Sequence, residues 1–507
     1  MIYMKKLNLR NAILLQTDQL WPLIVLAGFI FFVSLVPLPP NDFWWHLKIG
    51  ELIFIKGSIP TSNLFAWTLS PDAPFTYGAW LGELLIYIIY RIGKLELVTF
   101  IRTLLAAITF WLVAYESWRK SGSWRLSALA VALACGMTIN NLPTRPQIWS
   151  WVPFMFYLII LGKFVDRQIR GRWLFVLPVI MTFWVNAHGA FILGGVMISI
   201  FFVGEGLRTL IKSPGALTWK EVGYLGGAGV LSGLAMFINP RHIEIVGYVM
   251  DLLTDKPSQK LIVEWQSPSP AGIANIIFFM SILLFIVILA YTKKRLTPTE
   301  VLLVMSFLWL AWSGQRYVVW YGLVGIPVLM KMIQGLPFST PHLVPQRNWL
   351  NWVIAVILFL PVLLVQPWFV ERFPLPERYW KLVIRNSLAG PLLGVETPVD
   401  PVEYLRDHPG GKIFNEMGYG SYLIWALPEQ GVFIDPRVEL YPYEQWEDYI
   451  RITNGAQYNE LLEKYGADCI LLDTELQNEL AQILKKDPTW ELEFKDKRAE
   501  LWKKMVP

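Results

Sequence analysis

The stretch that decides the fold is WPLIVLAGFIFFVSLVPLPPNDFWWHL, residues 21–47, in which a long apolar run leads into a polar and aromatic segment. The run from Trp21 to Pro37 approaches the roughly 20 residues that a helix needs to cross a membrane. Similar apolar runs recur at 273–291 and 349–368. No small-residue cleavage signature follows the first run, so we expect it to remain as a membrane anchor.

The overall composition also indicates a membrane protein. Hydrophobic residues make up 54% of the 507 residues, and charged residues only 16%. Soluble globular domains carry about 25% charged residues, so water cannot be the only solvent of this chain. The net charge of +5 requires no nucleic-acid partner, because the basic residues sit in short loops between apolar runs.

These short basic loops predict the orientation in the membrane, because Lys and Arg near the ends of spans are retained in the cytoplasm. All six basic groups share one side if the segment 77–92 does not cross. The groups are Lys5, Lys6 and Arg10; Arg119, Lys120 and Arg125; Lys163, Arg167, Arg170 and Arg172; Arg208, Lys212 and Lys220; Lys293, Lys294 and Arg295; and Lys331 with Arg347.

The resulting prediction is a polytopic α-helical membrane protein with two helices, 43–56 and 77–92, lying on the outer surface within the first outer loop. About eleven spans are expected within a membrane domain that covers residues 1–369. They lie near 20–38, 96–115, 124–141, 146–163, 173–188, 190–207, 222–239, 273–292, 297–314, 317–334 and 349–369.

Residues 370–507 have a mixed, charged composition that predicts a separate small α/β domain outside the cytoplasm. Apolar runs at 412–414, 431–435 and 468–472 are typical of buried strands. Helix-like stretches alternate with them at 401–407, 443–453, 456–465 and 474–485.

Asp42 follows the first apolar run at the start of a helix-like stretch, where its carboxylate could simply cap backbone N–H groups. At helical spacing Asp42 and His46 share one face, so the carboxylate could instead accept a proton or bind a cation. Glu83 lies in an apolar stretch, where a carboxylate needs a cation, a metal ion or a proton as partner. We expect catalytic roles for these three residues, with Asp42 and Glu83 as candidate ligands of a divalent metal.

Other polar side chains gather at the outer ends of the spans, where their cost favours a functional role. Asn186 and His188 flank an outer turn that does not itself require them. Arg145, Arg241 and Arg316 would form an arginine layer that suits phosphate oxygens, with snorkelling to lipid headgroups as the alternative. The predicted substrate-binding set is Arg102, Arg145, Gln147, Asn186, His188, Arg241, His242 and Arg316.

An acid directly after the first span, two surface helices, about eleven spans and an external carboxy-terminal domain resemble the GT-C superfamily of membrane glycosyltransferases. This superfamily includes the protein O-mannosyltransferases and the lipid A aminoarabinose transferases. In the O-mannosyltransferases the acid is an Asp-Glu pair, whereas Phe43 follows Asp42 here. The resemblance implies a sugar donor carried on polyprenyl phosphate, a membrane-lipid partner, and Asp42 at the position of the catalytic acid.

The chain is also similar to a group of bacterial multispan membrane proteins, which adds no agreed activity to this prediction. The similar segments are 45–50, 145–147, 184–189, 239–241, 264–265 and 433–437.

The predicted function is inverting glycosyl transfer at the outer face of the cell membrane, in which Asp42 deprotonates an acceptor hydroxyl and arginines hold the lipid phosphate. One alternative is a lipid or polysaccharide transporter, whose charges would bind an anionic substrate at the bilayer midplane. Another is a lipid-linked glycan polymerase or ligase, which shares the donor. No nucleophile elbow and no glycine-rich nucleotide loop is present in the sequence.

Overall fold

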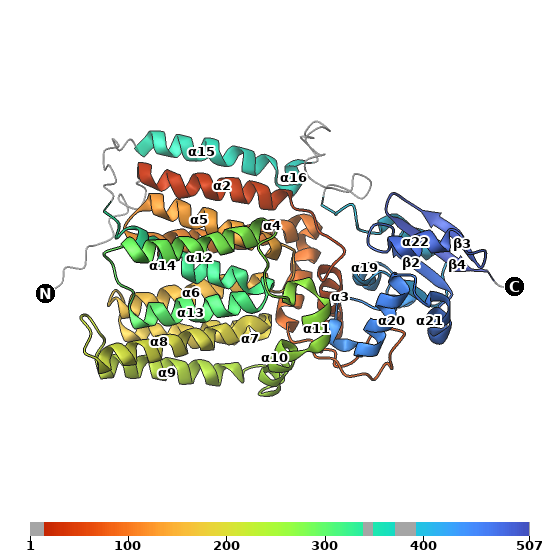
Figure 1. Cartoon of the computed structure of the whole chain (residues 1–507), viewed down its shortest axis with the longest axis horizontal. Coiled ribbons are helices and arrows are strands. Elements are labelled where there is room, and N and C mark those ends of the chain that lie inside the picture. Colours follow the sequence, from red (N-terminus) through yellow and green to blue (C-terminus); the bar gives the residue numbers. More distant parts are fainter. Residues whose placement is uncertain (1–14, 338–347, 371–391, 506–507) are drawn as a thin grey trace.

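The apolar runs form long helices, because a helix satisfies every backbone hydrogen bond within one segment and so tolerates a surrounding of lipid. A computed structural model describes residues 15–337, 348–370 and 392–505. Figure 1 shows the helices as a bundle at one end of the molecule and a small sheet at the other. The bundle contains α2 (Leu20–Leu35), α4 (Trp80–Ser121), α5 (Trp124–Thr138), α6 (Ile148–Val165), α7 (Val176–Ala187), α8 (Ile192–Leu210), α9 (Trp219–Met236), α12 (Ile273–Tyr291), α13 (Pro298–Ser313), α14 (Val318–Ile333) and α15 (Asn348–Leu364).

Within the described residues, several helical stretches are long and apolar enough to cross a membrane. They are Thr17–Leu35, Trp80–Ser121, Ile148–Val165, Gly189–Leu210, Ile273–Tyr291 and Gln315–Ile333, with shorter apolar helices at Gly171–Ala187, Pro298–Ser313 and Asn348–Leu364. The chain is therefore a multi-pass membrane protein. The count of eleven spans stays a prediction.

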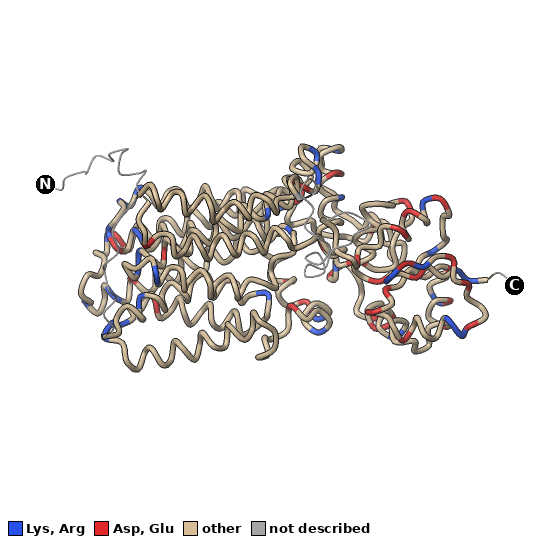
Figure 2. The backbone as a smooth tube through the Cα atoms, turned by 90° about the horizontal axis from the view of Figure 1, so that it is seen from above, with Lys and Arg blue, Asp and Glu red and all other residues tan. Residues whose placement is uncertain are grey.

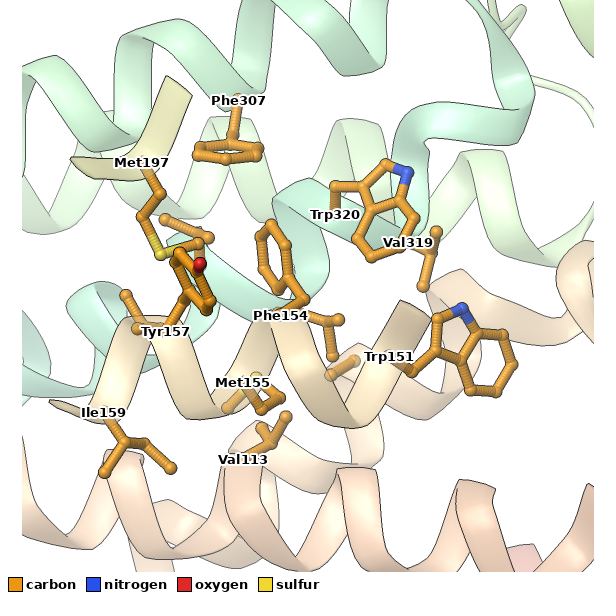
Figure 3. Packing of buried hydrophobic residues seen from close by; sticks show 14 of the residues in the cluster. Val113, Trp151, Phe154, Met155, Tyr157, Ile159, Met197, Phe307, Val319 and Trp320 are labelled. Atoms are coloured by element: carbon orange, nitrogen blue, oxygen red, sulfur yellow. The ribbon is translucent and has the colours of Figure 1, made fainter. Parts of the chain in front are cut away.

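The bundle packs around large apolar side chains contributed by α6, α13 and α14. The ring of Phe154 on α6 lies 4.9 Å from that of Trp320 and 5.4 Å from that of Phe307 (Figure 3). Trp151 and Met155 extend the same buried cluster. Phe154 and Phe307 meet edge to face, and such ring pairs contribute beyond the area they bury and help to fix the helices against one another.

The first loop carries α3 (Phe43–Lys56) and the first part of α4 beside it at one end of the bundle (Figure 1). The long helix α4 is interrupted at Gly93 and Lys94, and Lys94 has a positive φ of 53°. This break lies between the segment predicted for the surface and the segment predicted to span.

Figure 2 shows many Lys and Arg residues at the end of the bundle remote from the sheet. Lys5, Lys6, Arg10 and Arg347 of the predicted basic groups lie outside the described residues.

The carboxy-terminal region forms a sheet with strand order β1-β2-β4-β3, in which β1 and β2 are parallel and the other pairs are antiparallel. The predicted domain boundary at residues 369 and 370 directly precedes 371–391, which lie outside the described residues. The elements are β1 (Ile413–Asn415), β2 (Cys469–Asp473), β3 (Trp490–Lys495) and β4 (Ala499–Lys504), with helices α18 (Val399–Asp407), α19 (Met417–Ala426), α20 (Tyr443–Thr453), α21 (Tyr458–Tyr465) and α22 (Asn478–Leu484).

The predicted strand at 431–435 is wrong. Only Val432 makes an isolated bridge, with Ala66 of the first loop. The backbone of the next two residues is held by a side chain, because Asn415 accepts from the N–H of Phe433 and donates to the carbonyl of Ile434. With those groups engaged by an amide, the segment has no need of a neighbouring strand.

A second hydrophobic core joins the first loop to the carboxy-terminal region. Within it Arg437 pairs with Asp435 over 2.7 Å, and both side chains are fully buried. Arg437 also donates to the hydroxyl of Tyr77 in the first loop, over 3.1 Å. Burial opposes ionisation of the guanidinium, but the Asp435 carboxylate raises the pKa of Arg437 above its usual value. The guanidinium therefore stays charged, and Arg437 links two segments that are far apart in sequence.

We expect Arg437→Met to lower the stability of the protein strongly, because it leaves the buried Asp435 carboxylate without its cation. Breaking a buried pair from one side costs about 3–5 kcal/mol. The midpoint of thermal unfolding in detergent measures the effect. Arg451→Met is the matched control, since Arg451 is exposed and lies 3.9 Å from Asp448. Equal midpoints for the two variants would contradict the structural role of Arg437.

The predicted orientation places the basic end of the bundle in the cytoplasm and the sheet outside it. We expect a cysteine at Glu429 to react with a membrane-impermeant maleimide in intact cells, and a cysteine at Ser213 to be protected. Background labelling should be low, because the native Cys135 and Cys469 are both buried. Labelling of the Ser213 position from outside would reverse the orientation.

Candidate functional site

A cavity of about 380 Å³ lies where the bundle, the first loop and the carboxy-terminal region meet. Its wall includes the start of α3, the start of α4, the loop before α6 and the turn before α8. The rest comes from α10 (Glu244–Thr254), the short turns Val263–Trp265 and Gln315–Tyr317, and residues of the carboxy-terminal region such as Met417 and Glu439. A volume of this size suits a small organic group such as a sugar.

Asp42, Arg145 and Glu264 form two linked ion pairs along this wall. Arg145 Nη1 donates to Asp42 Oδ2 over 3.2 Å, and Nη2 donates to Glu264 Oε2 over 2.8 Å. Burial opposes the charge on the guanidinium, but the Glu264 and Asp42 carboxylates raise the pKa of Arg145 above its usual value. The side chain of Asp42 does not cap α3. The carboxylate is therefore turned toward Arg145 at the cavity and away from the helix backbone.

His46 and Glu83 form a buried pair on the same wall, 2.8 Å apart between Nδ1 and Oε1. Burial lowers the pKa of His46, although the neighbouring Glu83 partly offsets this effect. The imidazole is then neutral at pH 7, with its Nδ1–H donated to Glu83 and Nε2 left as an acceptor. In the described part of the chain, the second carboxylate oxygen of Glu83 is buried without a hydrogen-bond partner.

His188 presents a donor to the cavity. Its Nδ1 accepts from the hydroxyl of Ser150 over 2.9 Å and from the backbone N–H of Ala190 over 3.2 Å. Ser150 is oriented in turn, because Trp184 donates its indole N–H to the hydroxyl oxygen over 2.8 Å. With Nδ1 used as an acceptor, the neutral imidazole carries its proton on Nε2.

Arg316 is the second cavity arginine, and its surroundings differ from those of Arg145. Its guanidinium lies over the ring of Trp265, 4.3 Å from the centroid. Among the described residues, no carboxylate lies within ion-pair distance of Arg316, whereas Arg145 has two such partners. Arg316 therefore offers its positive charge to the cavity.

The remaining predicted residues divide into one that faces the cavity and four that do not. Gln147 lines it and donates to Asn141 over 3.2 Å, while its own amide oxygen is buried without a partner in the described chain. Arg102, Asn186, Arg241 and His242 are absent from the wall as far as the structure describes it.

Arg102 and Asn186 make bonds that hold helices together. Arg102 donates to the carbonyls of Val33 and Val36 at the end of α2. The amide of Asn186 accepts from Trp80 and donates to the carbonyls of Thr182 and Ile238. Through these bonds both side chains link helices, and we do not include Arg102 and Asn186 in the candidate site.

Arg241 and His242 lie in the loop before α10. His242 is exposed, with a positive φ of 49°, and contacts the carbonyl of Phe237. Arg241 is half-buried, and its backbone N–H bonds to the side chain of Asn239. The predicted layer of three arginines is thus reduced at the cavity to Arg145 and Arg316.

Solved structures of membrane glycosyltransferases are similar to this chain. The arabinofuranosyltransferase AftD from Mycobacteria matches 96% of this chain and 40% of its own, with 13% identity and a TM-score of 0.52. The apo oligosaccharyltransferase of Archaeoglobus fulgidus matches 90% of this chain and 70% of its own, with 11% identity and a TM-score of 0.49. ArnT from Cupriavidus metallidurans, bound to undecaprenyl phosphate, matches 95% of this chain and 97% of its own, with 13% identity and a TM-score of 0.45.

This chain has the GT-C fold. The likeness to the arabinofuranosyltransferase carries this assignment, and at 13% identity it shows the fold alone. The chain spans 40% of that protein. No family model matches the sequence, and no curated protein matches it. The resemblance predicted from the acid after the first span and the arrangement of helices is confirmed at the level of fold.

Within this GT-C fold, the predicted metal ligands do not converge. Asp42 is paired with Arg145, and Glu83 is paired with His46. In the described residues, no three His, Cys, Asp or Glu side chains are grouped as metal ligands would be. A second structure of the archaeal oligosaccharyltransferase was solved with Zn and sulfate. The donor set of this chain does not fit such an ion as it stands, and we derive no step through a metal.

The predicted site residues did not include two acids of the cavity wall. Glu264 entered the sequence analysis only within the segment 264–265, and it holds the far side of Arg145. Glu439 comes from the carboxy-terminal region, and its carboxylate accepts from the hydroxyl of Tyr248 over 3.0 Å. Burial raises the pKa of Glu439 above its usual value. Its position just after the 433–437 segment was the one available signal, and only the fold brings it to the cavity.

Proposed function

We propose that this chain is a glycosyltransferase that moves a sugar from polyprenyl phosphate to an acceptor hydroxyl at the outer face of the membrane. The observation that supports it is the cavity at the end of the bundle, where the Asp42 carboxylate and the Arg316 guanidinium line the same space. A group that accepts a proton and a cation that holds a phosphate are the two parts this transfer needs.

The proposed reaction exchanges one bond at the anomeric carbon for another. The acceptor oxygen forms a bond to this carbon while its proton passes to the Asp42 carboxylate. The bond from the carbon to the phosphate oxygen breaks, and its electron pair stays on that oxygen as polyprenyl phosphate leaves. Attack from the face opposite to the leaving group would invert the anomeric configuration.

Arg316 is the proposed phosphate ligand, because its charge is not matched by a carboxylate of the described chain. A guanidinium donates two parallel hydrogen bonds to a phosphate, and it stabilises the charge that grows on the leaving oxygen. Arg145 has a different part, since its two carboxylates already neutralise it. It fixes the direction of Asp42 and adds a second cation behind the phosphate.

The transporter alternative calls for a substrate site at the bilayer midplane. The cavity instead lies beneath the Asp42 loop, between the bundle and the carboxy-terminal region. This position supports the enzyme over a transporter. A lipid-linked glycan polymerase or ligase would differ from the proposed enzyme in its acceptor alone, so it is a special case of the same reaction.

Asp42→Asn should lower turnover by about 10²–10⁴-fold, because it keeps the size of the side chain and removes the proton acceptor. The assay follows sugar transfer from a set of polyprenyl-phosphate sugars by purified protein, together with donor binding. Glu51→Gln is the matched control, since Glu51 lies on the same helix, pairs with Lys48 and is outside the cavity wall. Turnover near that of the wild type in Asp42→Asn would remove Asp42 from the mechanism.

Arg316→Gln should weaken binding of a polyprenyl phosphate by about 10–10²-fold, because a hydrogen bond to a charged group is worth about 1.5–3 kcal/mol. Titration of purified protein with undecaprenyl phosphate measures the dissociation constant. Arg172→Gln serves as the control, because Arg172 is exposed and lies outside the cavity wall. Unchanged affinity in Arg316→Gln would show that the phosphate binds elsewhere.

A further inference from the structure

The helical turn that carries Asp42 is completed by a side chain from the carboxy-terminal region. Because α3 begins at Phe43, the N–H of Trp45 in its first turn has no carbonyl partner within the helix. It donates to the hydroxyl oxygen of Ser421 over 3.1 Å, and the Ser421 hydroxyl donates to the Asn41 carbonyl. The hydroxyl thus caps one of the free N–H groups in the first turn of α3, next to Asp42.

Ser421 reaches this position on a closely packed support. It lies on α19, which packs against α3, and its side chain is fully buried. A Cβ at Gly418 of α19 would lie 3.1 Å from the carbonyl oxygen of Pro40, so the helix approaches the backbone as closely as a glycine allows.

The chain just before Asp42 is held by the same region. The N–H of Leu38 donates to the carbonyl of Leu392 over 2.8 Å, and the N–H of Gly394 donates to the carbonyl of Leu38 over 2.9 Å. The segment between the first span and α3 is therefore fixed at both ends by carboxy-terminal residues.

We propose that Ser421 is a positioning residue for Asp42, an inference that rests on the proposed function. An acid at the start of a helix is normally drawn to the free backbone N–H groups of the first turn. Because Ser421 accepts the hydrogen bond of the Trp45 N–H, the Asp42 carboxylate does not cap this group. It pairs with Arg145 at the cavity instead. The carboxy-terminal region thereby becomes part of the reacting site.

Ser421→Ala should lower kcat by about 10–10²-fold, because a displacement of about 1 Å at a reacting group has an effect of this size. The KM for the polyprenyl-phosphate donor should stay within about twofold of the wild-type value, because Arg316 is untouched. Ser281→Ala is the control, since Ser281 is a buried serine of α12 that donates to the carbonyl of Phe278 and lies outside the cavity wall. An unchanged kcat in Ser421→Ala would overturn the proposal.

A double-mutant cycle separates positioning from a general loss of stability. In the Asp42→Asn background, Ser421→Ala should cause no further loss of rate, because the group it positions is already gone. A loss by the same factor in both backgrounds would overturn the proposal. If Ser421→Ala does not fold, Gly418→Ala provides the second route. Its added methyl pushes α19 away from Pro40, and it should lower kcat only where Asp42 is present.

A structure of Ser421→Ala in lipid nanodiscs gives a result that does not depend on activity. The expected change is that the Asp42 carboxylate turns away from Arg145 and accepts a hydrogen bond from the N–H of Trp45. An unaltered pair between Asp42 and Arg145 would refute the role of Ser421. Absence of transfer by the wild-type protein with every donor would refute the proposed function, while this structure would still decide the positioning.

Discussion

A guanidinium group buried at the edge of a membrane needs carboxylates beside it, and the surroundings of Arg145 show how the chain meets that need. Asp42 comes from the end of the first span and Glu264 from a loop more than two hundred residues later. Together the two acids compensate the charge of the arginine, and loss of both would leave it buried without a partner carboxylate. The ion pairs therefore hold the first loop, the start of α6 and the segment after α10 in one place, and the cavity is the space they surround.

The helices of the bundle could be predicted from the sequence because a membrane leaves little choice of structure for an apolar run. The break in α4 also fell where a glycine and a lysine separate two apolar segments, at Gly93 and Lys94. The carboxy-terminal region was harder to predict. Its segment 431–435 has the composition of a buried strand, but the amide of Asn415 takes up the backbone bonds that a strand would make. Neither β3 nor β4 was foreseen, and α19 carries two glycines in its first turns, which local propensity counts against.

Several polar residues of the cavity could be found in the sequence because they stand at the ends of apolar runs, where a polar side chain is costly. Asp42, His46, Glu83, Arg145, Gln147, His188 and Arg316 share that signal, and the fold brings them to one cavity. The same signal selected Arg102 and Asn186, whose polar groups form hydrogen bonds to neighbouring helices. Position at a membrane boundary shows that a polar group must be satisfied, but not whether a ligand or another helix satisfies it. Glu439 and Ser421 carry no such signal, because their surroundings in the sequence resemble those of any soluble domain.

The two hydrophobic cores hold different parts of the site in place. Arg145, His188 and Arg316 lie at the ends of helices that pack in the bundle core, and Arg316 is the phosphate ligand of the proposed reaction. The second core contains residues of both α3 and α19, so the backbone that carries the proposed proton acceptor is also held by the carboxy-terminal region. A reaction between a lipid-borne donor and an acceptor from outside the membrane requires these two halves to keep a fixed distance. The pair of Asp42 with Arg145 and the bond from Tyr248 to Glu439 both join these two halves, and they help to set that distance.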